Sequence, residues 1–265
     1  MRVDRFHKLV YTPAGSDDIV LAIAATRSGG VGILNAELGA ETAQLLAQLE
    51  RLASSAGGEY GLRLRAVDDA IVASLRAFAA RGLAWLILDE DAIAAGEAAV
   101  AALRAEGIKV LAETTHTTWT GRPLDDIVDG VVAKGNEAGG FVGESSSFIM
   151  VQKWLANTRL PLFVRGGLTP QTAAACDAVG VAGGVLDSQV LLLRESPFAT
   201  ALAPVFEKLA GNETVAIGDS ETGRFFRVLL RPGHHVARDF SVVGEGKNTD
   251  VLRELIRGKV NWRNP

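Results

Sequence analysis

The sequence of 265 residues lacks the features typical of secreted and membrane proteins. Its single cysteine, Cys176, cannot form an internal disulfide. No run of 18 apolar residues could span a bilayer, and the opening segment MRVDRFHKLV has no apolar core typical of a signal peptide. These absences together predict a soluble protein of the reducing cytoplasm.

The charge balance and the missing motifs exclude further classes. Lys and Arg number 27 against 31 Asp and Glu, so the chain offers no basic field for a nucleic-acid backbone. The pair His234-His235 has no nearby cysteine or third histidine, and no spacing typical of metal ligands occurs elsewhere. No GxGxxG motif opens the chain, which argues against a dinucleotide-binding fold. We therefore expect no nucleic acid, membrane or metal partner.

The chain up to about residue 211 alternates short apolar runs with longer segments of helical period, as in repeated βαβ units. Eight such units in about 200 residues predict a closed (β/α)8 barrel. The predicted strands are Phe6–Tyr11, Val31–Leu34, Gly61–Leu64, Ala84–Leu88, Lys109–Ala112, Ile127–Ala133, Leu162–Val164 and Gly183–Leu186. The predicted helices are Asp18–Ser28, Ala40–Ser55, Val67–Arg81, Asp91–Glu106, Ser146–Asn157 and Pro170–Val179. After the fifth strand, THTTWTGRPLDD is too short and polar for a full helix.

The composition changes near Gly211-Asn212. Of 40 alanines, 38 precede residue 213, so we divide the chain into a barrel of residues 1–211 and an appendage of residues 212–265. The appendage contains two strand-like runs, Thr214–Ile217 and Arg224–Leu230, and a short helical pattern at Asp250–Arg257. Because it is too small to bury a core, we expect it to pack on the barrel or on a neighbouring domain. A large aromatic residue, Trp262, stands close to the end, and we expect the chain to be part of a longer polypeptide.

In a (β/α)8 barrel the functional residues lie where the strands end in βα loops. The residue after nearly every predicted strand is polar, which fits a functional mouth and also fits ordinary loop polarity. These residues are Asn35, Arg65, Asp89, Glu113, Lys134, Arg165 and Asp187.

Two glycine-rich turns carry the most specific signal. The sixth strand continues into AKGNEAGGFVGE, in which Lys134 and Glu137 are placed to face a ligand. The seventh continues into RGGLTP, where glycines precede a helix that is predicted to be capped by Thr169 with Pro170 at its first position. Such a helix N-terminus binds anions, so the turn predicts a phosphate site. A phosphate there would repel Asp187, which we expect to point toward Arg165 or a backbone cap.

Three segments, LAIAATRSGGVGIL, AKGNEAGGFVGE and PLFVRGGLTPQTAAACDAVGVAGGVLDSQVLLLRES, resemble the nitronate monooxygenase and FMN-dependent enoyl reductase family over about residues 6 to 200. The opening LVYTPAG with KGNEAGG and GGVLDSQ is similar to the form built into polyketide and polyunsaturated fatty-acid synthases. The resemblance implies an FMN-binding (β/α)8 barrel that acts on acyl chains or other small molecules beside further synthase domains. It places the FMN phosphate on Gly166, Gly167 and Ser188, and the isoalloxazine against Thr12, Pro13, Lys134, Gly139 and Gly140.

The sequence departs from that family at one decisive position. The family motif continues EAGGH, and its histidine is credited with acid/base chemistry beside the flavin, whereas this chain has Phe141. Phenylalanine cannot move a proton. The remaining candidates for catalytic residues are His116, which follows the fifth strand, and Lys134.

Two functions stay open from the sequence. One is an FMN-dependent oxidoreductase of the enoyl reductase or nitronate monooxygenase type, in which the protein positions the cofactor and the substrate. The other is a catalytically degenerate barrel with a structural or docking role in a megasynthase.

Overall fold

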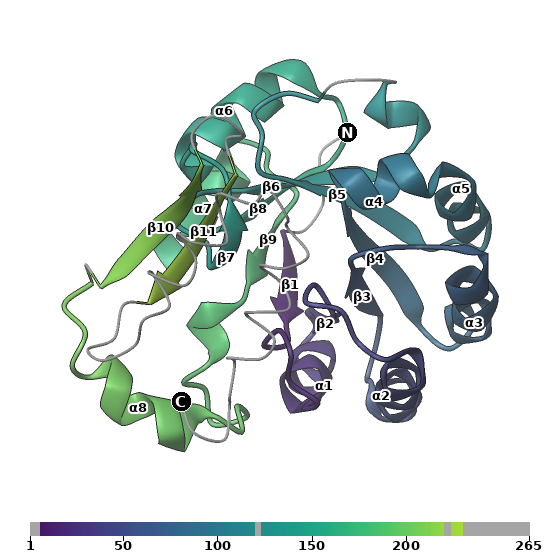
Figure 1. The fold of residues 1–265 in the computed structure, drawn as a ribbon, viewed down its shortest axis with the longest axis horizontal. Helices are drawn as coiled ribbons and strands as arrows, with labels where there is room; N and C mark the ends of the chain where they lie inside the picture. The colour runs from purple at the N-terminus through teal and green to yellow at the C-terminus, as the bar shows by residue number, and fades with distance from the viewer. Residues whose placement is uncertain (1–5, 120–122, 212, 220–223, 230–265) are drawn as a thin grey trace.

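The computed structural model describes residues 6–119, 123–211, 213–219 and 224–229. Eight parallel strands close into a barrel with helices outside it, as the βαβ pattern predicts (Figure 1). Neighbouring strands in the barrel follow the order β1-β2-β3-β4-β5-β6-β8-β9. Their bounds are β1 His7–Tyr11, β2 Val31–Asn35, β3 Tyr60–Leu64, β4 Leu83–Asp89, β5 Lys109–Thr114, β6 Gly130–Lys134, β8 Leu162–Arg165 and β9 Gly183–Leu186.

The helices lie on the outer face of the barrel. They are α1 Val20–Arg27, α2 Thr42–Ser55, α3 Asp69–Ala79, α4 Glu90–Ala95, α5 Glu97–Ala105, α6 Ser147–Asn157, α7 Pro170–Ala178 and α8 Ala199–Phe206. The single helix predicted over Asp91–Glu106 is wrong, because Gly96 separates α4 from α5. A Cβ at Gly96 would lie 2.8 Å from the carbonyl oxygen of Val67, so the close approach of the preceding loop requires glycine there.

The crossover after β5 is reduced, as its polar sequence indicates. Between β5 and β6 the described residues form only one helical turn, η1 Leu124–Asp126. Over the described part of this crossover, the wall of the barrel mouth is therefore mostly a loop.

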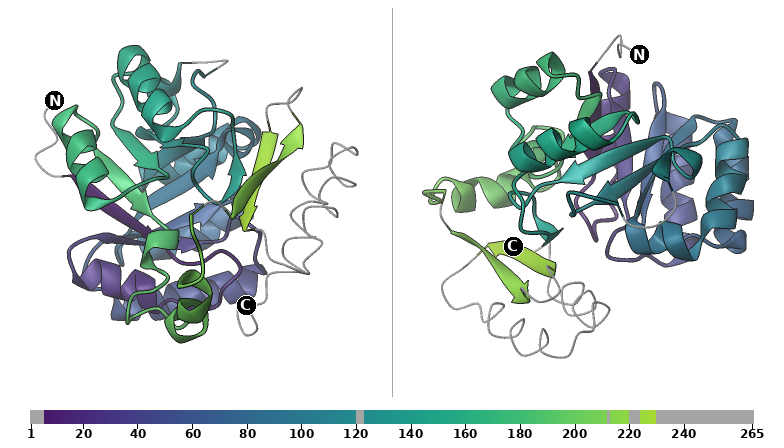
Figure 2. Two further views of the ribbon diagram at one scale, coloured as in Figure 1. Left: turned by 90° about the vertical axis from the view of Figure 1, so that its left-hand side faces the viewer. Right: turned by 90° about the horizontal axis from the view of Figure 1, so that it is seen from above.

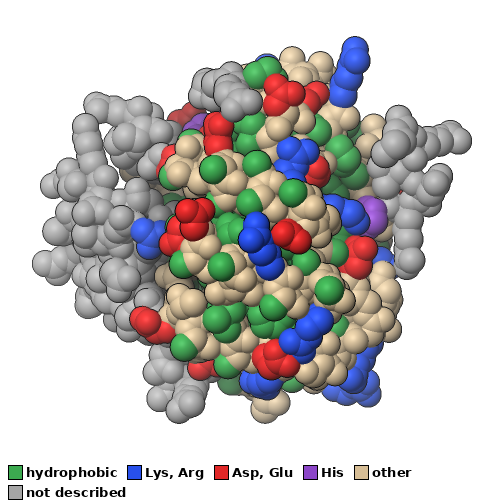
Figure 3. All heavy atoms as spheres, turned by 90° about the vertical axis from the view of Figure 1, so that its right-hand side faces the viewer, with side chains coloured by type: hydrophobic (Ala, Val, Ile, Leu, Met, Phe, Trp, Pro, Cys, Tyr) green, Lys and Arg blue, Asp and Glu red, His purple; other side chains and the backbone are tan. Residues whose placement is uncertain are grey.

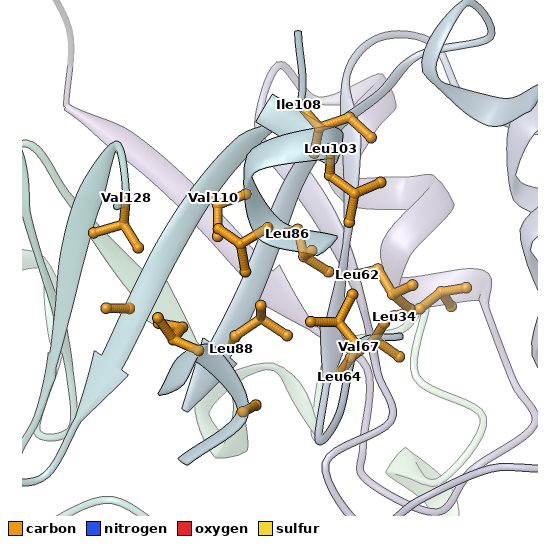
Figure 4. Packing of buried hydrophobic residues seen from close by; sticks show 14 of the residues in the cluster. Leu34, Leu62, Leu64, Val67, Leu86, Leu88, Leu103, Ile108, Val110 and Val128 are labelled. Carbon is orange, nitrogen blue, oxygen red and sulfur yellow. The ribbon is translucent and has the colours of Figure 1, made fainter. Parts of the chain in front are cut away.

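Two apolar layers stabilise the fold. Outside the barrel, strand residues pack against the helices, as Leu62, Leu86 and Val110 do near Leu103 of α5 (Figure 4). Inside, a second cluster fills the barrel, and Trp85 and Phe163 meet edge to face at 5.9 Å between ring centroids. This packed interior confines chemistry to the mouth above it.

The two strand-like runs of the appendage form an antiparallel hairpin, β10 Thr214–Asp219 and β11 Arg224–Leu229. The hairpin pairs with a short strand of the first glycine-rich turn, β7 Gly140–Val142, and makes a three-stranded sheet beside the barrel (Figure 2). The predicted helix at Asp250–Arg257 and the pair His234-His235 lie outside the described residues. The division at residue 211 stays a prediction.

On the outer face toward α3 and α5, charged side chains of both signs alternate with apolar ones (Figure 3). Among the described residues, no helix is both long and apolar enough to cross a membrane.

Candidate functional site at the barrel mouth

The carboxyl ends of the strands bring charged side chains together inside the barrel mouth. Glu113, Lys134 and Arg165 all lie there, as their positions at the ends of predicted strands indicate, and each is at most 4% exposed. Arg63 of β3 takes the place that the sequence suggested for Arg65: Arg63 is the buried arginine of the mouth. Glu37, in the loop after β2, completes the set. We call these five residues the mouth cluster.

Arg165 is the centre of the mouth cluster. Its Nη1 lies 3.1 Å from both carboxylate oxygens of Glu113 and 3.3 Å from Oε2 of Glu37. Its Nε donates to Oδ2 of Asp187 at 2.9 Å, and its guanidinium carbon lies 4.8 Å from the ring centroid of Tyr11. A buried guanidinium is stable only when it is paired and hydrogen-bonded, and these contacts meet that requirement.

Glu113 receives a second arginine and a phenol. Nε of Arg63 lies 3.3 Å from Oε1 of Glu113, and the Tyr11 hydroxyl donates to Oε2 at 3.3 Å. Arg63 also pairs with Asp89, with 3.6 Å between Nη2 and Oδ2. Burial by itself would raise the pKa of Glu113, but Arg165 and Arg63 offset it and lower that pKa to about 2. The carboxylate is therefore ionised at neutral pH.

Glu37 is likewise held as a carboxylate. Burial opposes its charge, while Arg165 and Lys134 lower the pKa of Glu37 well below its ordinary value. Asn35 positions this residue, because its side-chain oxygen accepts the backbone N–H of Glu37 at 3.1 Å and its amide donates to Oε1 at 3.3 Å.

Lys134 differs from the rest of the mouth cluster. Its Nζ lies 4.0 Å from Oε2 of Glu37, and no described residue accepts a hydrogen bond from it. The side chain is 3% exposed. Burial and then the nearby Arg165 lower the pKa of Lys134, although the two carboxylates raise it in part.

A cleft of about 110 Å³ opens above the mouth cluster, and Lys134 lies at its lining together with Glu37, Arg63 and Glu113. The outer wall includes His116 and Phe141, so the structure brings the two predicted catalytic residues and the replaced family position into one cleft. His116 is half exposed, and its Nδ1 lies 3.3 Å from Oε1 of Glu90.

The predicted phosphate turn has the expected backbone. Gly166 and Gly167 have φ values of +113° and +62°, which only glycine adopts readily, and α7 begins with the predicted Thr169 cap and Pro170. Asp187 points away from the turn, as expected, because it pairs with Arg165 and accepts the N–H of Ser188 at 2.6 Å.

Several residues expected to contact a flavin lie outside the mouth cleft. Thr12 lines a second cleft of about 100 Å³ between the β1 and β2 loops, where its hydroxyl accepts the N–H of Asn35. Pro13, Gly166, Gly167 and Ser188 line neither cleft. Of the two glycines of the first turn that were expected to contact the flavin, Gly140 has a φ of +77° and would direct a Cβ to 3.8 Å from Nζ of Lys134. A Cβ at Gly139 would meet no atom within 4 Å.

Glu137 caps the next helix, and the expectation that it faces a ligand stays a prediction. Its carboxylate accepts the backbone N–H of Ser147 at 2.9 Å and the Ser147 hydroxyl at 3.0 Å, at the N-terminus of α6. A carboxylate at that place also complements the helix dipole.

Phe141 is held by the hairpin. It stands opposite Phe226 of β11 in the strand register, and the two rings meet edge to face at 4.8 Å between centroids. Arg227 of the same strand donates to the carbonyl of Asn136. The turn that carries the family motif is thus fixed by a segment far along the chain.

The sequence did not identify Glu37, Arg63 and Tyr11 as members of the site. Arg63 carried a usable signal, because it interrupts the apolar run of β3 at a position where alternate side chains point into the barrel. Glu37 depends on the turn that Asn35 forms, and Tyr11 reads as an ordinary aromatic strand residue.

No model of a protein family matches the sequence, and no curated protein matches it. Among solved structures, FabK from Thermotoga maritima is similar with a TM-score of 0.75 and 20% identity, over 96% of this chain and 79% of that one. A nitroalkane oxidase from Streptomyces ansochromogenes is similar with a TM-score of 0.69 and 18% identity, over 94% and 83%. The enoyl reductase domain of MlnA, from the macrolactin cluster of Bacillus amyloliquefaciens, gives 0.63 and 14%, over 90% and 66%.

These neighbours confirm, at the level of the fold, the resemblance that the motifs indicated. The chain has the barrel fold of enoyl reductase and nitroalkane oxidase structures, one of them a domain from a biosynthesis cluster.

Proposed function

We propose that this chain is a barrel of the enoyl reductase and nitronate monooxygenase type that no longer carries out flavin chemistry, and that it serves as a structural or docking domain of a polyketide or fatty-acid synthase. The observation that carries the proposal lies beside the predicted phosphate turn, where the backbone N–H groups of Thr169, Asp187 and Ser188 donate to the chain's own side chains.

The loop donors near that turn are already used. The N–H of Ser188 donates to Asp187, and the N–H of Asp187 donates to Gln189 at 3.0 Å. At the start of α7, the N–H of Thr169 donates to the Thr172 hydroxyl at 2.8 Å. An incoming phosphate would have to displace these bonds and recover their energy.

Carboxylates also surround the turn. One oxygen of Glu137 lies 3.5 Å from the position that a Cβ on Gly166 would take, and the other lies 3.9 Å from the equivalent position on Gly167. Asp187 points away from the turn but adds a negative charge at Ser188, and the cation that could offset it, Arg165, is shared with Glu113 and Glu37. A phosphate dianion would be repelled here. These residues do not fit FMN in the arrangement that the family resemblance implies.

The space for the isoalloxazine ring is restricted as well. The mouth cleft, at about 110 Å³, is smaller than the roughly 300 Å³ at the lower end of small-molecule sites. Below it, the barrel axis is filled by the paired side chains of Arg165 and Glu113. Above it, Phe141 replaces the acid/base histidine.

The synthase context is supported by the sequence resemblance to synthase-borne domains and by the shared fold of the MlnA domain. The pairing of the hairpin with β7 adds an ordered sheet outside the barrel, as we expect of a structural or docking domain.

A second candidate is an FMN-dependent oxidoreductase that acts on an acyl chain. Two observations favour it: the amine of Lys134, with no hydrogen-bond acceptor among the described residues, and the open space beside Gly139. In that case Lys134 would contact the flavin ring and His116 would serve as the acid/base group.

One experiment separates the two candidates. The purified chain is titrated with FMN and, in parallel, with riboflavin, and flavin fluorescence and the visible spectrum are recorded. We expect a colourless protein and FMN binding no tighter than a Kd of about 100 µM. Co-purified flavin, or stoichiometric FMN binding at micromolar concentration, would establish the oxidoreductase and overturn the proposal.

A further inference from the structure

The amine of Lys134 is a buried group that the proposed function does not use. It lies at the end of β6 with a side chain that is 3% exposed, and its nitrogen borders the mouth cleft. Its nearest carboxylate oxygen, on Glu37, is 4.0 Å away, which is beyond hydrogen-bonding distance. The nitrogen therefore borders the cleft and is held there by a charge contact with Glu37 rather than by a hydrogen bond.

The surroundings of Lys134 oppose its positive charge. The guanidinium groups of Arg165 and Arg63 both disfavour the ammonium form, and burial disfavours it more strongly, while Glu37 and Glu113 compensate only in part. Each of those two carboxylates is itself bound to an arginine. An amine that is desolvated next to other cations is the arrangement that activates lysine as a nucleophile.

The cleft selects against anions. Its lining contains five carboxylate residues, Glu37, Asp89, Glu90, Asp91 and Glu113, against one permanent cation, Arg63, and the amine of Lys134. A carboxylate or phosphate ligand would meet a net negative field, whereas a small neutral molecule would not. The volume of about 110 Å³ suits a compact compound.

We propose that Lys134 is a reactive amine that condenses with a small, neutral aldehyde or ketone in the mouth cleft to form a Schiff base. The neutral amine attacks the carbonyl carbon, a C–N bond forms, and the carbonyl oxygen takes up a proton to give a carbinolamine. Loss of that oxygen as water gives the protonated imine. Overall, one ammonium group and one carbonyl compound yield one iminium group and one water, so the step needs no oxidant or reductant.

Glu37 is the counter-ion that faces this amine. Its Oε2 lies 4.0 Å from Nζ, and Asn35 and Arg165 hold the carboxylate in place. Because this carboxylate favours the ammonium form, the proton that the ammonium releases passes to solvent in the cleft and not to Glu37.

The test uses the full chain, D-glyceraldehyde as the probe and sodium cyanoborohydride, which converts an imine into a stable secondary amine. Intact mass gives the number of adducts, and peptide mapping locates them. We expect Lys134 to be modified first at neutral pH, at least about tenfold faster than the exposed Lys153 of α6. Pyruvate, an anionic carbonyl compound, is expected to modify Lys134 more slowly than glyceraldehyde.

Variants complete the experiment. Lys134→Arg keeps a cation but cannot form an imine, so it should lose the fast adduct, whereas the control Lys153→Arg should keep it. Glu37→Gln removes a carboxylate that favours the ammonium form, so it should speed modification of Lys134 without changing that of Lys153. Even modification of all lysines, or an unmodified Lys134 in the wild-type chain, would overturn the proposal. The flavin titration reads a different property, so the proposed function and this inference can fail separately.

Discussion

Arg165 of β8 and Glu113 of β5 form a two-oxygen ion pair inside the barrel mouth, with Nη1 at 3.1 Å from each carboxylate oxygen. The two strands are separated by β6, so the pair bridges the barrel opening. Both side chains are nearly inaccessible to solvent. A buried charge in that position is stable only while its partner is present. Loss of either side chain is therefore expected to destabilise the folded barrel.

Glu113→Gln should destabilise the fold markedly. The substitution leaves Arg165 and Arg63 without their shared carboxylate, and removal of one partner of a buried pair costs about 3–5 kcal/mol in the free energy of unfolding. Urea denaturation measures the loss. The matched control is Glu50→Gln, which breaks the exposed pair with Arg81 and should change the midpoint little. Equal effects of the two substitutions would contradict the role given to the mouth cluster.

The pH dependence of the unfolding free energy should also reflect the ionised Glu113. The pKa of Glu113 is lowered to about 2 in the folded chain, against 4.5 ordinarily. A lowered carboxyl pKa stabilises the fold fully above the unfolded-state pKa, and this stabilisation is lost as the pH falls from about 4.5 toward 2. Glu37 acts in the same direction. In Glu113→Gln, the slope of unfolding free energy below pH 4.5 should decrease by up to about 1.4 kcal/mol per pH unit. An unchanged slope would show that Glu113 does not carry the effect.

The fold could be predicted from the sequence because each βα unit repeats a local pattern. Apolar strands such as Val31–Asn35 are buried on both faces, and amphipathic helices such as Thr42–Ser55 bury Leu45, Leu49 and Leu52 on one face. The break at Gly96 could not be predicted, since it results from contact with Val67 of a different segment. Nor could the sheet formed by β7 and the hairpin, which joins residues more than 80 positions apart.

The site was predictable in part. Lys134, Glu113 and Arg165 follow from the rule that functional residues lie at the ends of barrel strands. Which side chains would pair was not predictable, because the partners come from different strands and the pairing depends on the diameter of the barrel. Glu37 shows this most clearly: it reaches Arg165 across 128 positions of sequence.

Phe226→Ala should release the hairpin from the barrel. Phe226 is buried and packs on Phe141, and an aromatic pair contributes about 0.5–1.5 kcal/mol beyond its apolar burial. Hydrogen exchange should show protection of the β10 and β11 amides reduced by about tenfold, with the barrel strands unaffected. Phe225→Ala, at the neighbouring position of the same strand, is the control and should have a smaller effect. Equal loss of protection in both variants would assign the effect to β11 as a whole.

Asp187→Asn should increase FMN affinity. The change removes a negative charge beside the phosphate turn and releases Arg165 from one of its three carboxylate partners. We expect binding at least about tenfold tighter than in the wild-type chain, or about 1.4 kcal/mol, by fluorescence titration. The control is Asp177→Asn, an exposed carboxylate near the far end of α7. If neither substitution changes the affinity, repulsion by Asp187 is not what keeps FMN out.

Phe141→His should fail to create a nitronate oxidase, although it installs the side chain that the family motif carries. The imidazole would face the mouth cleft, but Glu137 would still lie against the phosphate turn and Asp187 would still occupy the N–H of Ser188, so FMN would have no anchor. The substitution would also remove the aromatic contact with Phe226 and loosen β7. Oxygen consumption with added FMN and propyl nitronate should stay at the level of free FMN in Phe141→His. The double variant Phe141→His with Asp187→Asn should consume oxygen faster than the single variant Phe141→His. Turnover by Phe141→His alone would mean that the flavin site is intact and that the histidine was its one missing part.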